Sequence, residues 1–244
     1  LAQASQALGL PARVAVRVNP DFELKGSGMK MGGGPRQFGV DVEVVPEMLG
    51  WIAREGLAFE GFHVFAGSQN LRAESICEAQ LKSYELALRL AATAPAGLSQ
   101  VRFLNLGGGF GVPYFPGERS LDLAPIGASL QTIVERAAGE LPQAHIVIEL
   151  GRFLVAEAGV YVTRVVDRKL SRGQVFLVTD GGLNHHLSAS GNFGQVLRKN
   201  YPVTIGNRVG STEREVSSVV GPLCTPLDLL ADRMDLPVAQ VGDL

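Results

Sequence analysis

Residues 101–112 read Val-Arg-Phe-Leu-Asn-Leu-Gly-Gly-Gly-Phe-Gly-Val, an apolar run that ends in three consecutive glycines. Such a run is typical of a buried strand in a parallel sheet. Gly107, Gly108 and Gly109 allow the backbone to turn with unusual dihedral angles and to approach another group closely. Since exposed backbone N–H groups suit a phosphate, one interpretation is a phosphate-binding loop at the carboxyl end of a strand. The other is a structural turn that binds no ligand.

The stretch does not fit a dinucleotide-binding fingerprint. In that fingerprint the glycine loop opens directly into a helix, and an acidic residue follows about 20 residues later. Here Pro113 and Pro116 follow the glycines at once, which predicts that no helix begins at the loop. The meaning of the loop therefore depends on the other motifs of the chain.

The composition is that of an ordinary globular protein with a large core. The 244 residues are 46% hydrophobic and 19% charged, and the net charge of −2 indicates no broad basic surface for nucleic acid. Cys77 and Cys224 provide neither a disulfide framework nor the spacing of a metal site, so we expect a cytoplasmic protein without a bound metal. Because the chain does not begin with Met and ends in Val241-Gly242-Asp243-Leu244, typical of the start of a strand, we expect an internal fragment.

Strands and helices alternate through the first part of the chain. Apolar and β-branched runs predict strands at 12–18, 59–65, 101–106 and 145–149. Amphipathic periodicity predicts helices over 46–56, 73–93 and 126–137, and the glycine-rich segment 24–39 is predicted to be a long loop. The chemically interesting loops all follow carboxyl ends of strands, which indicates a parallel α/β fold, either a (β/α)8 barrel or an open sheet.

The pattern changes near residue 158. Short β-rich runs follow at 159–167, 174–179, 203–205 and 215–220, with one brief predicted helix around 228–234. We therefore predict two domains, an incomplete α/β domain over 1–157 and an incomplete antiparallel β domain over 158–244.

Three residues could carry chemistry. Arg152 could bind a phosphate or carboxylate in a bidentate manner, and Glu149 could pair with a cationic ring nitrogen. The alternative for both is a surface ion pair. Cys224 lies between Pro222 and Pro226, where it could act as an acid or nucleophile, although a lone cysteine is often only a small buried residue.

Together these pieces resemble the alanine-racemase-like, fold-type III pyridoxal phosphate (PLP) enzymes, in the branch of the diaminopimelate, ornithine and arginine decarboxylases. Six motifs match in the family's order. They are Arg17-Val18-Asn19-Pro20, Gly67-Ser68-Gln69, Gly107-Gly108-Gly109-Phe110, Glu149-Leu150-Gly151-Arg152, Asp180-Gly181-Gly182-Leu183-Asn184, and Gly221-Pro222-Leu223-Cys224 with Asp228. The resemblance implies a partial (β/α)8 TIM barrel followed by an antiparallel β domain. Leu150 departs from the family's proline.

The resemblance also implies a role for each motif. The residues implied to bind the cofactor phosphate are Ser68, Gly107, Gly108, Gly109 and Arg152. Arg17, Phe65 and Gly151 are implied to belong to the same cofactor site. Glu149 is implied to face the pyridine nitrogen, keeping it protonated so that the ring withdraws electrons strongly.

Cys224 is implied to return a proton to the Cα carbanion after the carboxylate leaves. Its segment enters the partner subunit's active site in the family, which implies a homodimer. The resemblance places the Schiff-base lysine before Leu1 and a late phosphate-binding tyrosine after Leu244, so these 244 residues alone are not expected to bind PLP covalently or to be active.

Departures from the family pattern concern the substrate. Phe65 stands where the family usually has a ring-stacking histidine, while His63, on the same face, is interpreted as a structural residue. Thr225 replaces the acidic residue that holds the distal amino group in basic amino-acid decarboxylases, so we do not expect diaminopimelate, lysine or ornithine. Residues 29–34 and 184–187 resemble a subgroup from bacterial exopolysaccharide (exosortase A system) and aminoglycoside-type clusters, which implies a modified or carrier-bound amino acid.

The predicted function is PLP-dependent decarboxylation of an amino acid or a derivative of one. One alternative is a racemase or epimerase on the same scaffold, which breaks the Cα–H bond instead and releases no carbon dioxide. The other is a non-catalytic decarboxylase-like protein that binds partners, against which the retained Glu149, Arg152 and Cys224 argue.

Overall fold

The computed structural model describes residues 1–23, 29–30, 32–98, 100–190 and 198–244. Part of the predicted loop over 24–39 therefore lies outside the described residues. The chain forms two compact units. The first unit comprises residues 1–112 with 119–156, and the second comprises residues 113–118 with 157–244.

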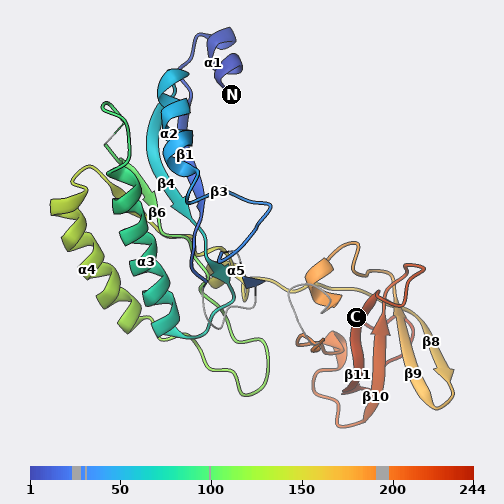
Figure 1. Cartoon of the computed structure of the whole chain (residues 1–244). Helices are drawn as coiled ribbons and strands as arrows, with labels where there is room; N and C mark the ends of the chain where they lie inside the picture. Colours follow the sequence, from blue (N-terminus) through green and yellow to red (C-terminus); the bar gives the residue numbers. More distant parts are fainter. Residues whose placement is uncertain (24–28, 31, 99, 191–197) are drawn as a thin grey trace. The chain divides into compact units, whose positions relative to one another are not determined.

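A five-stranded parallel sheet forms the centre of the first unit (Figure 1). Its strands, in spatial order, are β3 (Val40–Asp41), β1 (Arg13–Asn19), β4 (Ala58–Val64), β6 (Phe103–Asn105) and β7 (His145–Val147). From β1 to β7 the strands follow the order of the chain, with α2 (Val45–Arg54), α3 (Ala73–Ala91) and α4 (Ala124–Glu140) between them. This order is that of a (β/α)8 barrel, because an open doubly wound sheet reverses its strand order at one point.

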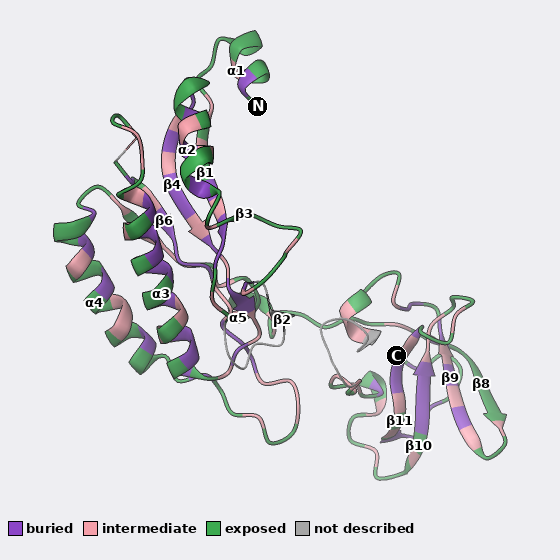
Figure 2. Ribbon diagram, in the orientation of Figure 1, coloured by how far each residue is buried: buried purple, intermediate pink, exposed green. Residues whose placement is uncertain are grey.

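The core of the first unit lies between this sheet and its helices. Figure 2 shows buried residues along the strands and along one side of α3. Five large core side chains have at most 1% of their surface exposed, namely Phe62, Leu49, Tyr84, Leu104 and Ile133. Buried apolar side chains recur every third or fourth residue on the helices, which agrees with the predicted helical periodicity. Pro46 near the start of α2 and Gly56 just after it match the predicted helix limits.

Several short elements of the first unit had no sequence signal. They are α1 (Ala2–Leu8), α5 (Gly151–Val155), and the strand pair β2 (Met29–Lys30) with β5 (Gly67–Ser68). The predicted strand at 145–149 ends at Val147, and Gly151 begins α5 instead. Two-residue strands depend on a partner far away in sequence, so local patterns cannot reveal them.

The second unit contains a four-stranded sheet in the order β11–β10–β9–β8. The strands are β8 (Val165–Ser171), β9 (Gln174–Thr179), β10 (Arg214–Val220) and β11 (Leu229–Pro237), with 3-10 turns η1 (Leu187–Ser190) and η2 (Gly206–Arg208). The predicted β domain is confirmed as a fold class. Its sheet is mixed rather than wholly antiparallel, because β9 and β10 run parallel.

Local predictions in the second unit were partly wrong. Residues 228–234 were predicted to be helical but belong largely to β11, since pairing with β10 buries Ala231 and Leu236 and overrides the helix propensity of Leu, Ala and Met. Residues 203–205 form no strand, although Ile205 is buried in the core of this unit. The run predicted at 159–167 becomes a strand only from Val165 onward.

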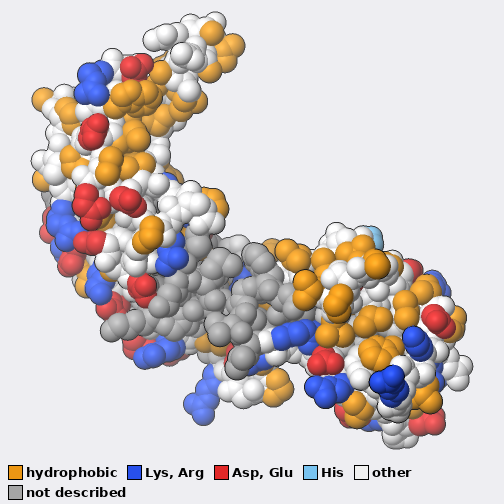
Figure 3. Space-filling view, turned by 45° about the vertical axis from the view of Figure 1, so that its right-hand side comes forward, with side chains coloured by type: hydrophobic (Ala, Val, Ile, Leu, Met, Phe, Trp, Pro, Cys, Tyr) orange, Lys and Arg blue, Asp and Glu red, His pale blue; other side chains and the backbone are white. Residues whose placement is uncertain are grey.

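Among the helices of the described residues, none is both long and apolar enough to cross a membrane. On the face shown in Figure 3, Lys and Arg side chains are interspersed with Asp and Glu side chains.

Candidate active site

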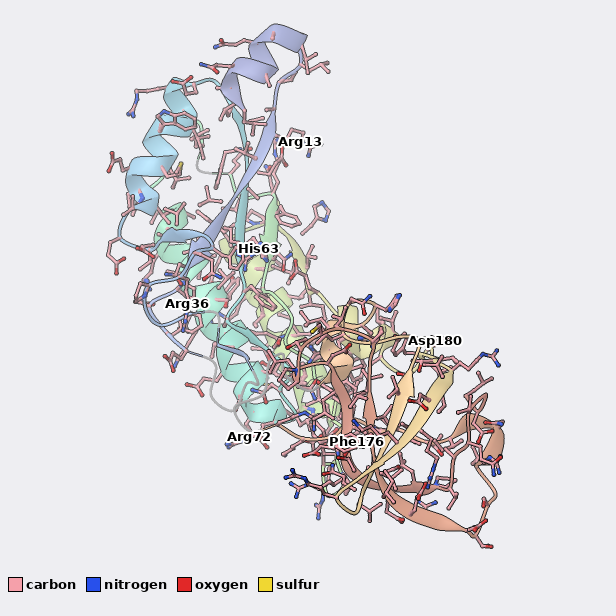
Figure 4. The ribbon with its side chains drawn as sticks, turned by 90° about the vertical axis from the view of Figure 1, so that its right-hand side faces the viewer. Arg13, Arg36, His63, Arg72, Phe176 and Asp180 are labelled. Atoms are coloured by element: carbon pink, nitrogen blue, oxygen red, sulfur yellow. The ribbon has the colours of Figure 1, made fainter. Side chains whose placement is uncertain are left out.

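The carboxyl ends of the parallel strands bring the chemically important residues of the first unit into one row. Arg17 on β1 pairs in register with His63 on β4, which pairs with Asn105 on β6, which pairs with Val147 on β7. Residues in register across a parallel sheet point to the same face. Figure 4 marks this row at the labelled His63. In parallel α/β folds this end of the strands is where ligands bind.

The three glycines form a tight turn between the ends of β4 and β7. Gly107 (φ +77°) and Gly109 (φ +95°) adopt left-handed backbone angles that other residues rarely reach. A Cβ at residue 107 would lie 2.5 Å from the Val64 carbonyl oxygen, and a Cβ at residue 108 would overlap the carbonyl oxygen of Glu149. The Glu149 N–H donates to the Gly107 carbonyl (2.9 Å). Close packing against two neighbouring strands therefore explains why glycine stands at positions 107 and 108.

Asn105 connects this glycine turn to the Glu149 carboxylate. Its Oδ1 accepts the Gly107 N–H (2.8 Å), and its Nδ2 donates to Glu149 Oε1 (2.9 Å). Asn105 is only 6% exposed, whereas the Glu149 side chain is 44% exposed. Hydrogen bonds to a carboxylate are among the stronger ones in proteins, so the buried amide orients a carboxylate that still reaches solvent.

His63 lies beside the same carboxylate. Its Nε2 is 3.4 Å from Glu149 Oε1, which is longer than a well-formed hydrogen bond, and this nitrogen has no hydrogen-bond partner among the described residues. Burial lowers the pKa of His63 below 6.5, and the nearby Arg17 charge lowers it further, although the Glu149 charge acts in the opposite direction. His63 is therefore a neutral ring at pH 7. Both Asn105 and His63 reach Oε1, so Oε2 remains open to a ligand among the residues described.

Arg17, at one end of this row, lies near two aromatic rings. The Arg17 guanidinium carbon lies 5.7 Å from the centre of the Phe65 ring and 5.2 Å from that of Phe38. Both distances fall within the range of a cation–π interaction. Phe65 thus presents a ring beside Arg17 that can stack on a flat ligand but has no proton to donate.

Gln69 links Arg152, a predicted phosphate contact, to Val112, three residues after the glycine turn. Its Oε1 accepts from Arg152 Nη1 (2.9 Å), and its Nε2 donates to the Val112 carbonyl oxygen (2.6 Å). The preceding residue, Ser68, is held in β5 opposite Met29. Arg152 is an exposed residue of α5. A single side chain thus ties the loop after β4, the glycine loop and the start of α5 together.

Cys224 belongs to the second unit. It is exposed and lies in the loop between β10 and β11. The loop is closed by the Gly221 N–H, which donates to the Asp228 carbonyl (3.0 Å), and by the Asp228 carboxylate, which accepts the Leu223 N–H (2.9 Å). The backbone on both sides of the cysteine is therefore held, while the thiol stays accessible.

The sequence patterns assign no role to two residues of these sites, Asn105 and Gln69. Asn105 is part of an apolar run, and Gln69 lies in a matched motif without an assigned role. The structural role expected for His63 stays a prediction. A polar residue at the end of a buried strand, as Asn105 is between Leu104 and Leu106, is the signal that could have identified this residue.

A separate cavity lies at the opposite, amino end of the strands. It has a volume of about 760 Å³, and its lining includes Arg13, Glu60, Arg102, Phe103 and His145. Two of these residues, Arg13 and Glu60, form a bidentate pair (2.8 and 3.0 Å). In barrels of this kind the amino end of the strands serves stability, so this cavity is not the candidate site. The described residues also contain no cluster of three side chains suited to a metal ion.

The chain is similar in sequence to known proteins. Residues 1–156 match the model for the pyridoxal-binding domain of the pyridoxal-dependent decarboxylases. The chain is 40% identical over 238 residues to the L-glutamyl-(BtrI acyl-carrier protein) decarboxylase of Niallia circulans, covering 96% of this chain and 55% of that protein. It is 29% identical over 245 residues to the diaminopimelate decarboxylase of Helicobacter pylori strain J99, covering 98% of this chain and 56% of that protein.

The fold agrees as well. The crystal structure of the Helicobacter pylori diaminopimelate decarboxylase complexed with L-lysine superimposes with a TM-score of 0.76 at 29% identity, over 99% of this chain and 57% of that chain. These matches confirm the resemblance and the partial barrel with its β domain. The chain spans a little over half the length of the relatives it matches.

Proposed function

The chain belongs to the family of the pyridoxal-dependent decarboxylases, and we propose that the protein containing it removes the α-carboxylate of an amino acid or amino-acid derivative with PLP. The observation that carries this proposal is the direct packing of the glycine turn against Glu149. The glycine turn suits a phosphate, and the Glu149 carboxylate suits a ring nitrogen. Asn105 bonds both and so holds them at a fixed spacing. PLP requires these two groups at its two ends.

The described residues fit this cofactor. Glu149 presents Oε2 to a ligand while Oε1 is held by Asn105, and the buried Nε2 of His63 lacks a hydrogen-bond partner among the described residues. Phe65 offers an aromatic face beside them. We assign Gly107, Gly108, Gly109, Ser68 and Arg152 to the phosphate, with Arg17 and Gly151 lining the same site.

Each residue then has a defined task. When bound, PLP withdraws electrons from Cα and so allows the bond to the carboxylate to break. Glu149 holds the proton on the pyridine nitrogen, because a carboxylate beside the ring favours its protonated form. His63 stays neutral beside Glu149 Oε1. Cys224 Sγ donates the proton that Cα receives after carbon dioxide has left.

Thr225 supports a substrate without a distal positive charge. Its hydroxyl group cannot form an ion pair with an ammonium group at the far end of a substrate. The name of the Niallia circulans relative describes a glutamyl group on an acyl-carrier protein, which has no such charge. We therefore favour an aminoacyl group bound to a carrier, or an amino acid modified at its distal end.

The proposal includes a homodimer with shared active sites in the cytoplasm. Cys224 is exposed, so its thiol is accessible to a second subunit. Cys77 and Cys224 are both free, as thiols are in a reducing compartment. Sedimentation of the full-length protein measures the subunit number directly, and a monomer at all concentrations would contradict the shared site.

Carbon dioxide release from the full-length protein tests the function. The protein loaded with PLP should show an imine absorption band near the visible edge, and carbon dioxide should be released from a carrier-bound aminoacyl group but not from diaminopimelate. Release of none from any candidate, together with exchange of the Cα proton, would indicate a racemase instead. Absence of the band would exclude PLP chemistry.

A matched pair of variants tests the proposed proton donor. Cys224→Ala should divert product from the amine to the aldehyde, with PLP converted to pyridoxamine phosphate, because the proton then reaches the cofactor carbon instead of Cα. Cys77→Ala, which changes the same residue type in α3, should leave the product ratio unchanged. An unchanged ratio in Cys224→Ala would remove this residue from the mechanism.

A further inference from the structure

Two motif loops of the second unit meet at one buried carboxylate. Asp228 is only 2% exposed. Its Oδ1 accepts the Leu183 N–H (2.7 Å), and its Oδ2 accepts the Leu223 N–H (2.9 Å). Leu183 follows Asp180-Gly181-Gly182, and Leu223 directly precedes Cys224. We call Asp228 and these two N–H groups the aspartate clamp.

The clamp requires glycine on both loops. A Cβ at residue 182 would lie 2.5 Å from Asp228 Oδ2, and a Cβ at residue 221 would lie 2.5 Å from both Cγ and Oδ1 of the same side chain. These separations are far below van der Waals contact, which is about 3.5 Å. Neither glycine has a positive φ, so backbone conformation does not require glycine there. The closeness of the carboxylate does.

A second contact ties the same loops together at their base. Thr179 is 3% exposed, and its hydroxyl oxygen lies 2.8 Å from the Gly181 carbonyl oxygen and 3.1 Å from the Val220 carbonyl oxygen. The Thr179 hydroxyl group thus bridges Gly181, which precedes Gly182, and Val220, which precedes Gly221. The loops are joined at the base by Thr179 and further along by Asp228.

We propose that Asp228 is a positioning residue for Cys224, acting through the Leu223 N–H and anchored by the Leu183 N–H on the other loop. The inference rests on the proposed function, in which Cys224 Sγ delivers a proton to Cα. Delivery to one carbon rather than another depends on placement, because an error of about 1 Å can cost on the order of 100-fold in rate. An exposed loop cysteine achieves that placement only if the backbone beside it is held. Leu183 lies 45 residues away from Asp228, so the contact exceeds a local turn.

Two variants of the full-length protein test the clamp from opposite sides. Asp228→Asn keeps the shape of the side chain but turns an NH2 group toward one of the two N–H donors. Gly182→Ala leaves Asp228 and the cysteine loop unchanged in sequence and displaces the carboxylate from the other loop. Gly210→Ala is the matched control, since a Cβ at residue 210 meets nothing within 4 Å and its φ is not positive.

Two readouts distinguish positioning from simple stability. The first is the ratio of aldehyde to amine product, which should rise at least tenfold in both variants and stay unchanged in Gly210→Ala. The second is the alkylation rate of Cys224 by iodoacetamide, followed by peptide mass spectrometry with Cys77 as internal reference. This rate should rise severalfold in both variants while that of Cys77 stays constant.

The outcomes separate this inference from the proposed function. If Asp228→Asn does not fold, Gly182→Ala still decides, because it retains the carboxylate. A folded Gly182→Ala variant with the parental Cys224 alkylation rate would overturn the inference. If the parent protein releases no carbon dioxide, the proposed function fails, but the alkylation rates still establish whether Asp228 holds the cysteine loop.

Discussion

Replacing Gly108 by alanine should separate the glycine turn from the end of β7. A Cβ at this position would overlap the Glu149 carbonyl oxygen and lie 3.1 Å from the carbonyl carbon. Both are backbone atoms, so no side chain can rotate out of the way. Gly108 has no positive φ, unlike Gly107 and Gly109, and the substitution therefore tests the contact without adding backbone strain.

The expected cost follows from the contacts that must give way. Overpacking of this kind typically costs about 1–3 kcal/mol. Separation of the two segments also lengthens the hydrogen bond from the Glu149 N–H to the Gly107 carbonyl (2.9 Å), which is worth about 1 kcal/mol. The free energy of unfolding should fall by about 2–4 kcal/mol. At about 2–4 °C per kcal/mol for a unit of this size, Tm should fall by roughly 5–15 °C.

Thermal and urea unfolding of the full-length protein measure this loss, and fluorescence titration with PLP measures the accompanying loss of affinity. PLP Kd should rise about tenfold, a loss of about 1.4 kcal/mol, because the displaced turn is the proposed phosphate site. Gly127→Ala in α4 is the control, because a Cβ there meets nothing within 4 Å and alanine stabilises a helix interior by about 0.5–1 kcal/mol. Parental stability and PLP affinity in Gly108→Ala would refute the contact and the spacing argument built on it.

Three further predictions concern stability. Burial lowers the pKa of His63 below 6.5 despite the opposing Glu149 charge. The folded state should therefore lose stability as pH falls below about 6.5. Urea unfolding of His63→Gln should depend less on pH in that range. Tyr84→Phe removes the O–H that donates to Glu140 Oε2 (2.7 Å) and should lower the free energy of unfolding by about 1–2 kcal/mol, whereas an unchanged Tm would show that the bond contributes nothing. Hydrogen bonds from Gln240, Arg208 and Asn207 lower the pKa of Asp243 to about 2. The contribution of Asp243 to the free energy of unfolding should therefore be complete above pH 3.8 and disappear as pH falls toward 2. Urea unfolding of Asp243→Asn should lack this pH dependence.

Local patterns predicted most of the regular structure of the first unit. Alternation of strands with amphipathic helices gave β1, β4, β6 and β7 and the three helices between them, because each element buries one face whatever its neighbours are. The helix predicted around 228–234 failed for the opposite reason. Its residues favour a helix when considered alone, but β10 is available to pair with them.

The sequence by itself determined the class of site, since glycines, an acidic residue and an arginine after successive parallel strands must meet at one end of the sheet. Tertiary structure decided how those residues act on one another. Sequence spacing does not reveal that Asn105 joins the glycine turn to Glu149. Nor does it reveal that Asp228 joins Leu183 to Leu223, the residue before Cys224. The Asn105–Glu149 hydrogen bond spans 44 residues and the Leu183–Asp228 hydrogen bond spans 45. Their geometry is set by strand register and close backbone packing, which a one-dimensional pattern does not contain.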